Sequence, residues 1–148
     1  MQYRPLGKSP LKVSALCLGT MMFADQTDLA EARNIAAHAR EHGVNFIDTA
    51  DAYSTGKSES MVGELLKGVR EDWILATKVG NKMSERPNES QYSRSWMLRA
   101  CDAIDGMVLV AAPDQVARAR DLGREWRFDG VIDVVAGGAA RQQSVSNG

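Results

Sequence analysis

Residues 43–53 read Gly-Val-Asn-Phe-Ile-Asp-Thr-Ala-Asp-Ala-Tyr, so that a short apolar run ends in Asp48 and is followed five positions later by Tyr53. A short apolar run bounded by polar residues is typical of a buried strand, and Asp48 is therefore expected where a strand gives way to a loop. A second such run, residues 73–77, is followed by Lys78. Buried parallel strands end at the same edge of a sheet, so the sequence predicts that a carboxylate, a phenol and an amine lie together.

These three side chains form an acid–base group suited to the reduction of a carbonyl. Asp48 alone would be interpreted as a loop cap. A lysine cation within a few ångströms of a phenol favours the phenolate and so helps the phenol to release its proton. Asp48 would hold Lys78 in place. Carbonyl reduction needs such a group, because a general acid must protonate the oxygen as hydride arrives.

The residues before this run predict a hairpin, a strand and a helix. Residues 2–14 alternate weakly around a Gly-Lys-Ser-Pro turn, which indicates a β-hairpin, and residues 16–19 are typical of a strand. Asp28 and Glu31 have the spacing of a capping box, from which we expect a helix that ends at Gly43. The apolar stripe expected on this helix consists of Leu29, Ala32, Ile35, Ala36 and Ala39.

The residues after it continue the alternation. Ser58 is expected to cap a second helix, and residues 81–91 to form a polar loop before a third helix that begins at Ser93 or Ser95. The apolar stripe of the second helix, expected to pack in the core, consists of Met61, Val62, Leu65, Leu66 and Val69. Strands and helices in this order predict parallel strands with helices outside the sheet.

Beyond residue 104 the pattern predicts one further βαβ-like unit. We expect a strand over residues 106–112, a helix over residues 114–122 and a strand over residues 131–135. The polar residues 137–148 are expected to be disordered.

Five short motifs resemble the aldo/keto reductase family in their order and spacing. They are residues 6–14, 18–21, 43–53, 56–59 and 75–80. The resemblance covers about residues 1–103, so we divide the chain into this aldo/keto reductase-like part and a divergent tail, residues 104–148. It implies an α/β fold, a partial (β/α)8 TIM barrel that comprises roughly the N-terminal half of the barrel and an N-terminal β-hairpin.

The resemblance also implies a function and its residues. Members of the family are NADPH-dependent oxidoreductases that reduce aldehydes or ketones to alcohols. Asp48, Tyr53 and Lys78 match three of the family's four catalytic positions, with Tyr53 as the general acid. Gly19, Thr20 and Asp48 match residues that contact the nicotinamide end of the cofactor. A tight turn between strand and helix is the alternative for Gly19 and Thr20, and the sequence favours neither interpretation.

The chain departs from the family at the fourth catalytic position, which is a histidine after the next strand. Val110, Ala111 and Ala112 stand where that histidine is expected, and the chain's two histidines, His38 and His42, lie far upstream. The later region that holds the adenosine phosphate of the cofactor in the family is not recognisable either. We therefore expect impaired turnover, and weak NADPH binding by this chain alone.

The length of the chain agrees with a half barrel. A complete (β/α)8 barrel takes about 250 residues, whereas this chain has 148. A half barrel leaves strand edges and apolar surfaces uncovered, so we expect self-association through them. A shifted reading frame or an internal loss of coding sequence would explain the change of character near residue 104.

Composition excludes several classes of partner. With 18 basic and 19 acidic residues the net charge is −1, which gives no broad attraction to nucleic acid or to an anionic membrane. The apolar runs are shorter than the ~20 residues that span a bilayer. The N-terminus lacks the apolar core of a signal peptide, so we expect a cytoplasmic protein.

The cysteines and histidines predict no metal site. Cys17 and Cys101 lack metal-ligand spacing and are expected to be small buried residues in a reducing compartment. His38 and His42 share a helix face at i,i+4 spacing, but without a convincing third ligand a solvated helix face is the favoured interpretation.

Two hypotheses of function follow. The first is an oxidoreductase that acts on a small-molecule carbonyl substrate and is impaired in this truncated chain. The alternative is a non-catalytic truncated fragment, or a half barrel that depends on a partner.

Overall fold

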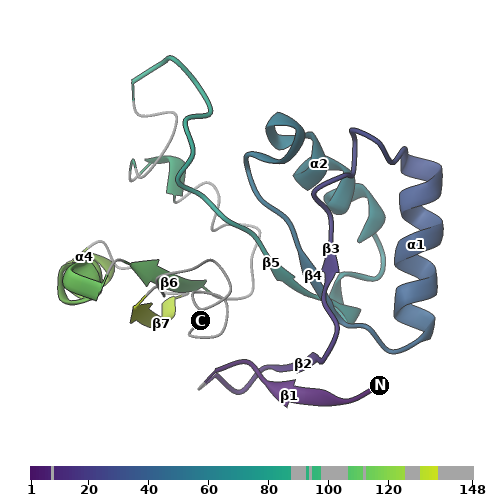
Figure 1. Ribbon diagram of the computed structural model, residues 1–148, viewed down its shortest axis with the longest axis horizontal. Coiled ribbons are helices and arrows are strands. Elements are labelled where there is room, and N and C mark those ends of the chain that lie inside the picture. The colour runs from purple at the N-terminus through teal and green to yellow at the C-terminus, as the bar shows by residue number, and fades with distance from the viewer. Residues whose placement is uncertain are drawn as a thin grey trace. The chain divides into compact units, whose positions relative to one another are not determined.

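The computed structural model describes residues 1–7, 9–87, 93, 95–97, 107–111, 113–125 and 131–136 (Figure 1). The chain divides into two compact units. The first comprises residues 1–4 and 12–104, and the second comprises residues 5–11 and 105–148.

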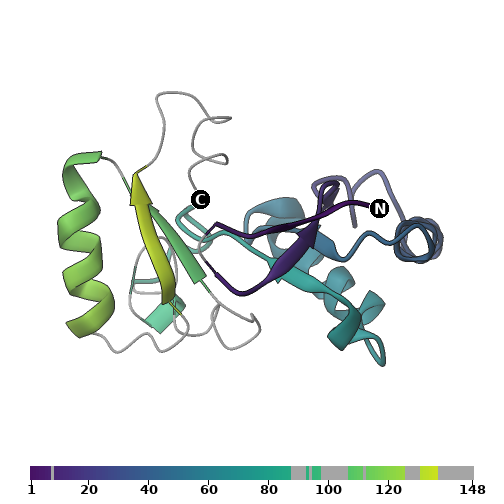
Figure 2. The same ribbon diagram turned by 90° about the horizontal axis from the view of Figure 1, so that it is seen from below.

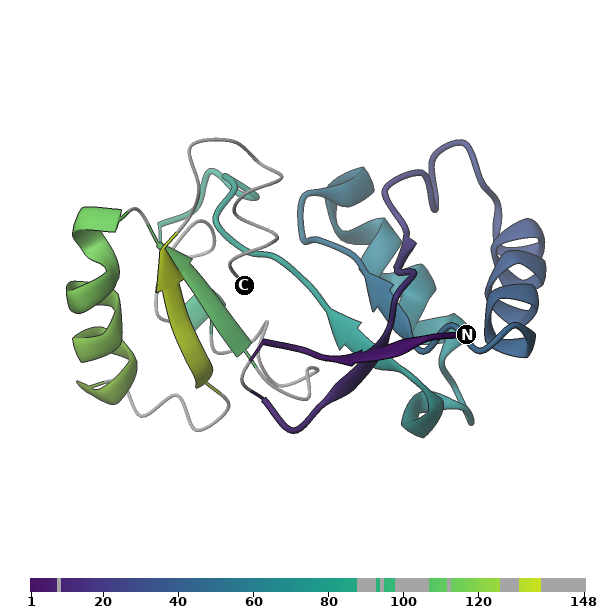
Figure 3. The same cartoon turned by 60° about the horizontal axis from the view of Figure 1, so that its bottom comes forward.

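The N-terminal residues form the predicted hairpin. Strand β1 (Tyr3–Pro5) pairs with strand β2 (Lys12–Ser14) (Figure 3). The backbone N–H of Leu6 donates to the carbonyl of Leu11 at 2.9 Å, and that of Ala15 donates to the carbonyl of Gln2 at 2.8 Å, which fixes the pairing as antiparallel.

A three-stranded parallel sheet organises the first unit, as the sequence predicts. Its strands are β3 (Leu18–Gly19), β4 (Phe46–Asp48) and β5 (Ile74–Ala76), in the order β3-β4-β5. The register places Gly19 opposite Asp48, and Asp48 opposite Ala76. The last residues of the three strands therefore form one row across the sheet.

Two helices, α1 (Leu29–Glu41) and α2 (Lys57–Leu65), lie on one face of this sheet, and the core is formed between them and the strands (Figure 1). The short 3-10 segments η1 (Tyr53–Gly56) and η2 (Arg70–Asp72) flank α2. The buried cluster consists of Phe23, Ala32, Val44, Ile47, Val62, Leu66 and Trp73, with Leu18, Ala39, Met61, Leu65, Val69 and Leu75 packed against it. The five apolar residues predicted for the second helix therefore pack in the core, although α2 ends at Leu65 and Leu66 and Val69 follow it.

The predicted stripe of the first helix is confirmed at its three alanines, since Ala39 packs against the core as well. Ala32 and Ala36 are buried, whereas Leu29 and Ile35 are each 37% exposed. The two larger residues lie on either side of the line through the alanines, so the helix approaches the sheet with its smallest side chains and leaves its larger ones at the margin.

The ends of α1 are formed as predicted. The Asp28 carboxylate accepts the backbone N–H of Glu31 at 2.9 Å, which caps the first turn. Gly43 follows the helix with φ +81°, and a Cβ there would lie 3.0 Å from atoms of both Met1 and Tyr3. Glycine is therefore needed at this turn for its conformation and for its space.

The prediction that Ser58 caps the second helix is wrong. Helix α2 begins one residue earlier, at Lys57, and its N-cap is Gly56 with φ +82° and no side-chain cap. Ser58 lies inside the first turn and is fully buried. Its hydroxyl bonds residues at the ends of the strands instead, as described below.

Only the start of the third helix can be compared with the prediction. Residues 95–97 are helical, and Ser93 Oγ accepts the backbone N–H of Trp96 at 3.3 Å, so Ser93 is the capping serine. The predicted loop over residues 81–91 has no helix or strand in its described part, residues 81–87. Cys101 lies outside the described residues.

The second unit contains the predicted βαβ unit (Figure 2). Strand β6 (Met107–Ala111) pairs in parallel with strand β7 (Val131–Ala136). The 3-10 segment η3 (Pro113–Gln115) and helix α4 (Val116–Glu125) follow β6 in the chain, and α4 contacts both strands. Residues 137–148, for which we expect disorder, lie outside the described part.

The described elements form no closed barrel, which agrees with the expected partial barrel. No helix in the described part of the chain combines the length and the hydrophobicity that a membrane span requires.

Candidate active site

The ends of β4 and β5 bring the three predicted residues together. Lys78 Nζ lies 2.6 Å from Asp48 Oδ1 and 2.7 Å from Asp48 Oδ2. The same ammonium donates to the backbone carbonyl of Thr49 at 2.7 Å. Asp48 is the last residue of β4, and Lys78 follows β5 by two positions, so the register of the two strands brings both residues to the same end and the same face of the sheet.

Tyr53 completes the group from the loop after β4. Lys78 Nζ donates to the phenol oxygen of Tyr53 at 3.2 Å and lies 4.9 Å from the centre of its ring. Carboxylate, carbonyl and phenol are therefore acceptors of one ammonium, which has three N–H donors. The Lys78 side chain is 45% exposed and that of Asp48 31%, so solvent or a ligand can reach the group. An ion pair this exposed adds little to folding stability, and its evident effect is to fix geometry.

The segment after Tyr53 has an unusual backbone. Ser54, Thr55 and Gly56 have φ of +47°, +54° and +82°, three consecutive residues in the left-handed region. Such a conformation costs ~1–2 kcal/mol for a residue other than glycine. The Ser54 hydroxyl donates to the carbonyl of Phe23 at 3.1 Å and so ties this turn to the loop after β3. Only Gly56 signals the turn in the sequence, and the strain at the other two positions could not be predicted.

Thr20 belongs to a buried group of hydroxyls. Its Oγ1 donates to the carbonyl of Asp48 at 3.0 Å and lies 3.0 Å from Ser58 Oγ. Ser58 in turn donates to the carbonyl of Thr20 at 2.8 Å and lies 3.2 Å from Thr49 Oγ1. The Thr20 side chain thus forms hydrogen bonds that stabilise the turn after β3. Gly19, in contrast, is exposed, with open space where a Cβ would be. Their contact with a cofactor stays a prediction.

Two carboxylates near the group were missed by reasoning from the sequence. Asp51 is 3% exposed, and its Oδ2 accepts Trp96 Nε1 at 3.2 Å, while Oδ1 has no hydrogen-bond partner in the described part of the chain. Burial raises the pKa of Glu59, and Asp51 adds to that rise, against the Thr77 hydrogen bond and Lys78. Both residues lie within motifs that resemble the family, residues 43–53 and 56–59, and these motifs are the only sequence signal that points to them.

The prediction that Cys17 is buried is wrong. Leu18 packs on the core, so the preceding residue falls on the opposite side of the chain, where Cys17 is exposed. The thiol nevertheless lies near the candidate site. Local desolvation raises its pKa to about 11, with a further rise from Asp48 and an opposing effect of Lys78.

His38 and His42 occupy the solvated helix face that the sequence favours. Both are exposed, and their ring centres lie 4.3 Å apart. Among the described residues, no group of three or more potential ligands could hold a metal ion.

Comparison with known proteins links this geometry to a family. The model described as the aldo/keto reductase family matches residues 15–116. It continues beyond residue 103, where we expected the resemblance to end, and takes in β6.

Curated relatives match the N-terminal part of the chain. A probable voltage-gated potassium channel subunit beta from Arabidopsis thaliana is 42% identical over 83 residues, which cover 53% of this chain and 25% of the relative. The uncharacterized oxidoreductase YqkF from Bacillus subtilis is 41% identical over 85 residues, covering 57% of this chain and 27% of the relative. The chain thus spans about a quarter of the length of these relatives.

Solved structures match almost the whole chain. A putative aldo-keto reductase from Pseudomonas aeruginosa gives a TM-score of 0.65 at 31% identity, covering 92% of this chain and 60% of that one. An aldo-keto reductase from Bacillus halodurans in its holo form gives 0.63 at 33% identity, covering 92% of this chain and 50% of that one.

Proposed function

Because this chain belongs to the aldo/keto reductase family, we propose that its Asp48–Tyr53–Lys78 group serves the NADPH-dependent reduction of an aldehyde or ketone to an alcohol. The single observation that supports the proposal best is the ammonium of Lys78, which contacts both the Asp48 carboxylate and the Tyr53 phenol. The similarity of the chain to an oxidoreductase and to an aldo-keto reductase supports the general class of reaction, which is oxidoreduction.

In this proposal Tyr53 gives its proton to the substrate oxygen. The N–H that Lys78 donates to the phenol oxygen stabilises the negative charge left there when the proton leaves. Asp48 and the carbonyl of Thr49 hold the ammonium in place, so no reorganisation is needed during the reaction. His38 lies in the last turn of α1 and His42 is its C-cap residue, and Lys78 is the side chain whose contact with Tyr53 is described.

The site fits the nicotinamide end of the cofactor, which would supply the hydride. Gly19 offers open space beside Asp48, since it lies opposite that residue in the sheet and a Cβ there would meet nothing within 4 Å. No part of the described chain is recognisable as an anchor for the adenosine phosphate. We therefore propose that this chain alone binds NADPH weakly.

The Tyr53→Phe substitution tests the proposed reaction. It removes the proton donor and leaves the ring, so NADPH oxidation with a panel of aldehydes and ketones should fall by ~10²–10⁴-fold. Tyr3→Phe is the matched control, because the exposed Tyr3 hydroxyl bonds only the carbonyl of Gly43 among the described residues. Activity that survives Tyr53→Phe would show that another group donates the proton.

A non-catalytic role is the second candidate. It is favoured by Val110, Ala111 and Ala112, which stand where the family's catalytic histidine is expected. Under this alternative the purified chain shows no carbonyl-dependent NADPH oxidation, and its function depends on a partner or on self-association.

A further inference from the structure

A threonine directly follows each strand of the parallel sheet: Thr20 after β3, Thr49 after β4 and Thr77 after β5. The register that aligns Gly19, Asp48 and Ala76 puts the three threonines in the next row. Because side chains alternate between the faces of a sheet, this row faces the helices, and Asp48 faces the other side.

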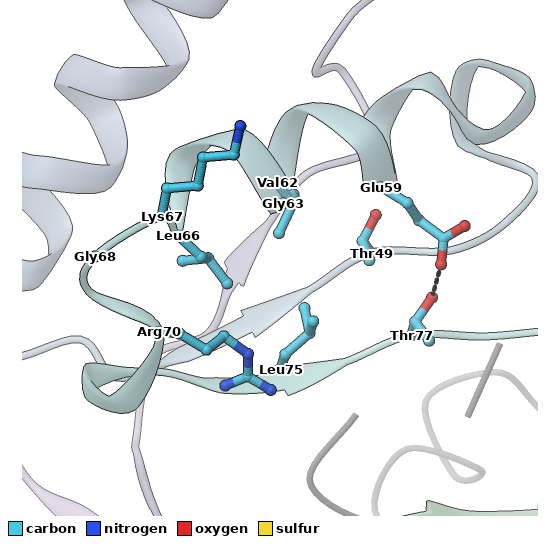
Figure 4. A pocket seen from close by; sticks show the side chains of 10 residues that line it. All are labelled: Thr49, Glu59, Val62, Gly63, Leu66, Lys67, Gly68, Arg70, Leu75 and Thr77. Carbon is cyan, nitrogen blue, oxygen red and sulfur yellow. Dashed lines mark hydrogen bonds between the residues drawn. The ribbon is translucent and has the colours of Figure 1, made fainter. Parts of the chain in front are cut away.

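The first turn of α2 binds this whole row through two consecutive residues. Ser58 Oγ bonds both Thr20 and Thr49, two residues that are 0% and 1% exposed. Glu59 Oε1 accepts the hydroxyl of Thr77 at 2.5 Å. Glu59, Thr77 and Thr49 are among the residues that line a groove of about 350 Å³. Figure 4 shows these three side chains together at one end of the lining, with the bond between Glu59 and Thr77 as a dashed line.

Thr77, which donates its hydroxyl to Glu59, directly precedes Lys78 in the chain. On the other side, the carbonyl of Lys78 accepts the backbone N–H of Asp51 at 3.1 Å. The backbone of Lys78 is therefore held from α2 through Thr77 and from the loop after β4 through Asp51. From that position its ammonium can contact Asp48 and Tyr53 simultaneously.

We propose that Glu59 and Thr77 are positioning residues for Lys78, a role that rests on the proposed reductase function. Neither touches the reacting atoms, and both act by fixing the end of β5. Burial and Asp51 disfavour a charge on Glu59. A partly buried carboxylate is costly unless it is hydrogen-bonded, and the Thr77 hydroxyl supplies that bond.

The test compares variants that remove the bond with variants that keep it. Thr77→Val and Glu59→Leu remove the donor and the acceptor, while Thr77→Ser and Glu59→Gln retain them. A displacement of a catalytic group by about an ångström costs up to ~10²-fold in rate, so we expect kcat to fall roughly tenfold to hundredfold in the first pair, with KM for the carbonyl little changed. The second pair should retain most of the wild-type kcat. Glu64→Gln is the matched control, because Glu64 lies on the exposed side of the same helix and pairs with Lys67.

A second readout does not depend on turnover. The NMR signals of the Lys78 side chain and the Tyr53 ring should shift in Thr77→Val and Glu59→Leu, and stay in place in Thr77→Ser and Glu64→Gln. If the wild-type chain is inactive, the proposed function fails while these shifts still decide the positioning role. Unchanged signals and unchanged kcat in folded Thr77→Val and Glu59→Leu would overturn the inference. Thr77→Ala replaces Thr77→Val if the latter does not fold.

Discussion

Lys78 connects the three members of the candidate site, because its ammonium contacts the carboxylate of Asp48, the carbonyl of Thr49 and the phenol of Tyr53. A lysine has a long, flexible side chain, and each of these contacts restricts it. The side chain is still 45% exposed. Its restraint therefore comes from specific acceptors and not from close packing.

Cys17 gives a chemical probe of this charge arrangement. Its thiol pKa is raised to about 11, so at neutral pH iodoacetamide should alkylate it ~10²-fold more slowly than an ordinary cysteine, since only the thiolate reacts. The rate should rise with pH until about 11. Asp48→Asn should lower the pKa and speed the reaction, and Lys78→Met should raise the pKa and slow it.

Peptide mapping by mass spectrometry separates Cys17 from Cys101 in this measurement. An alkylation rate equal to that of a free cysteine, or one insensitive to both substitutions, would contradict the assigned environment of the thiol.

At the scale of elements, the left-handed turn in η1 sets the direction in which the chain leaves Tyr53 and enters α2. Thr55 is exposed, with φ +54°, and no hydrogen bond of its side chain is among those described. The left-handed conformation costs a residue other than glycine ~1–2 kcal/mol. A glycine avoids this cost but destabilises the folded state by ~0.5–1 kcal/mol, because it has more conformational freedom in the unfolded chain. Thr55→Gly should therefore raise the free energy of unfolding by roughly 0.5–1 kcal/mol in urea titration.

Thr55→Ala is the control for that prediction, because it removes the same side-chain atoms beyond Cβ and keeps the strain. If Thr55→Gly is no more stable than Thr55→Ala, the turn is not strained as its dihedral angles indicate.

Elements with a local signal could be predicted from the sequence, and those fixed by distant contacts could not. Asp28 caps α1 as expected, because its partner is only three residues away. Ser58 looks like a cap by the same rule, yet its hydroxyl bonds Thr20, which is 38 residues distant. The trio of Asp48, Tyr53 and Lys78 could be predicted because the alternation of strands and helices implies parallel strands, whose carboxyl ends lie at the same edge of the sheet. The bond between Glu59 and Thr77 could not, because it depends on how α2 sits on the sheet.

At the scale of the whole molecule, the sheet of the first unit is covered by its helices on one face. Parallel sheets are normally covered on both faces. On the other face of this sheet Phe46, Ile74 and Ala76 are only half-buried, and β3 and β5 are the outer strands of the described sheet. Apolar surface and unpaired strand edges of this kind favour association.

We therefore predict that the purified chain self-associates. Light scattering after size exclusion should give a mass that exceeds 16.1 kDa and rises with concentration. Ile74→Lys places a charge on the open face and should shift the equilibrium toward the monomer, because pairing would bury that charge without a partner. Leu29→Lys, at a helix residue already 37% exposed, is the control and should leave the mass unchanged. A concentration-independent monomer would mean that the open face is covered within the chain itself.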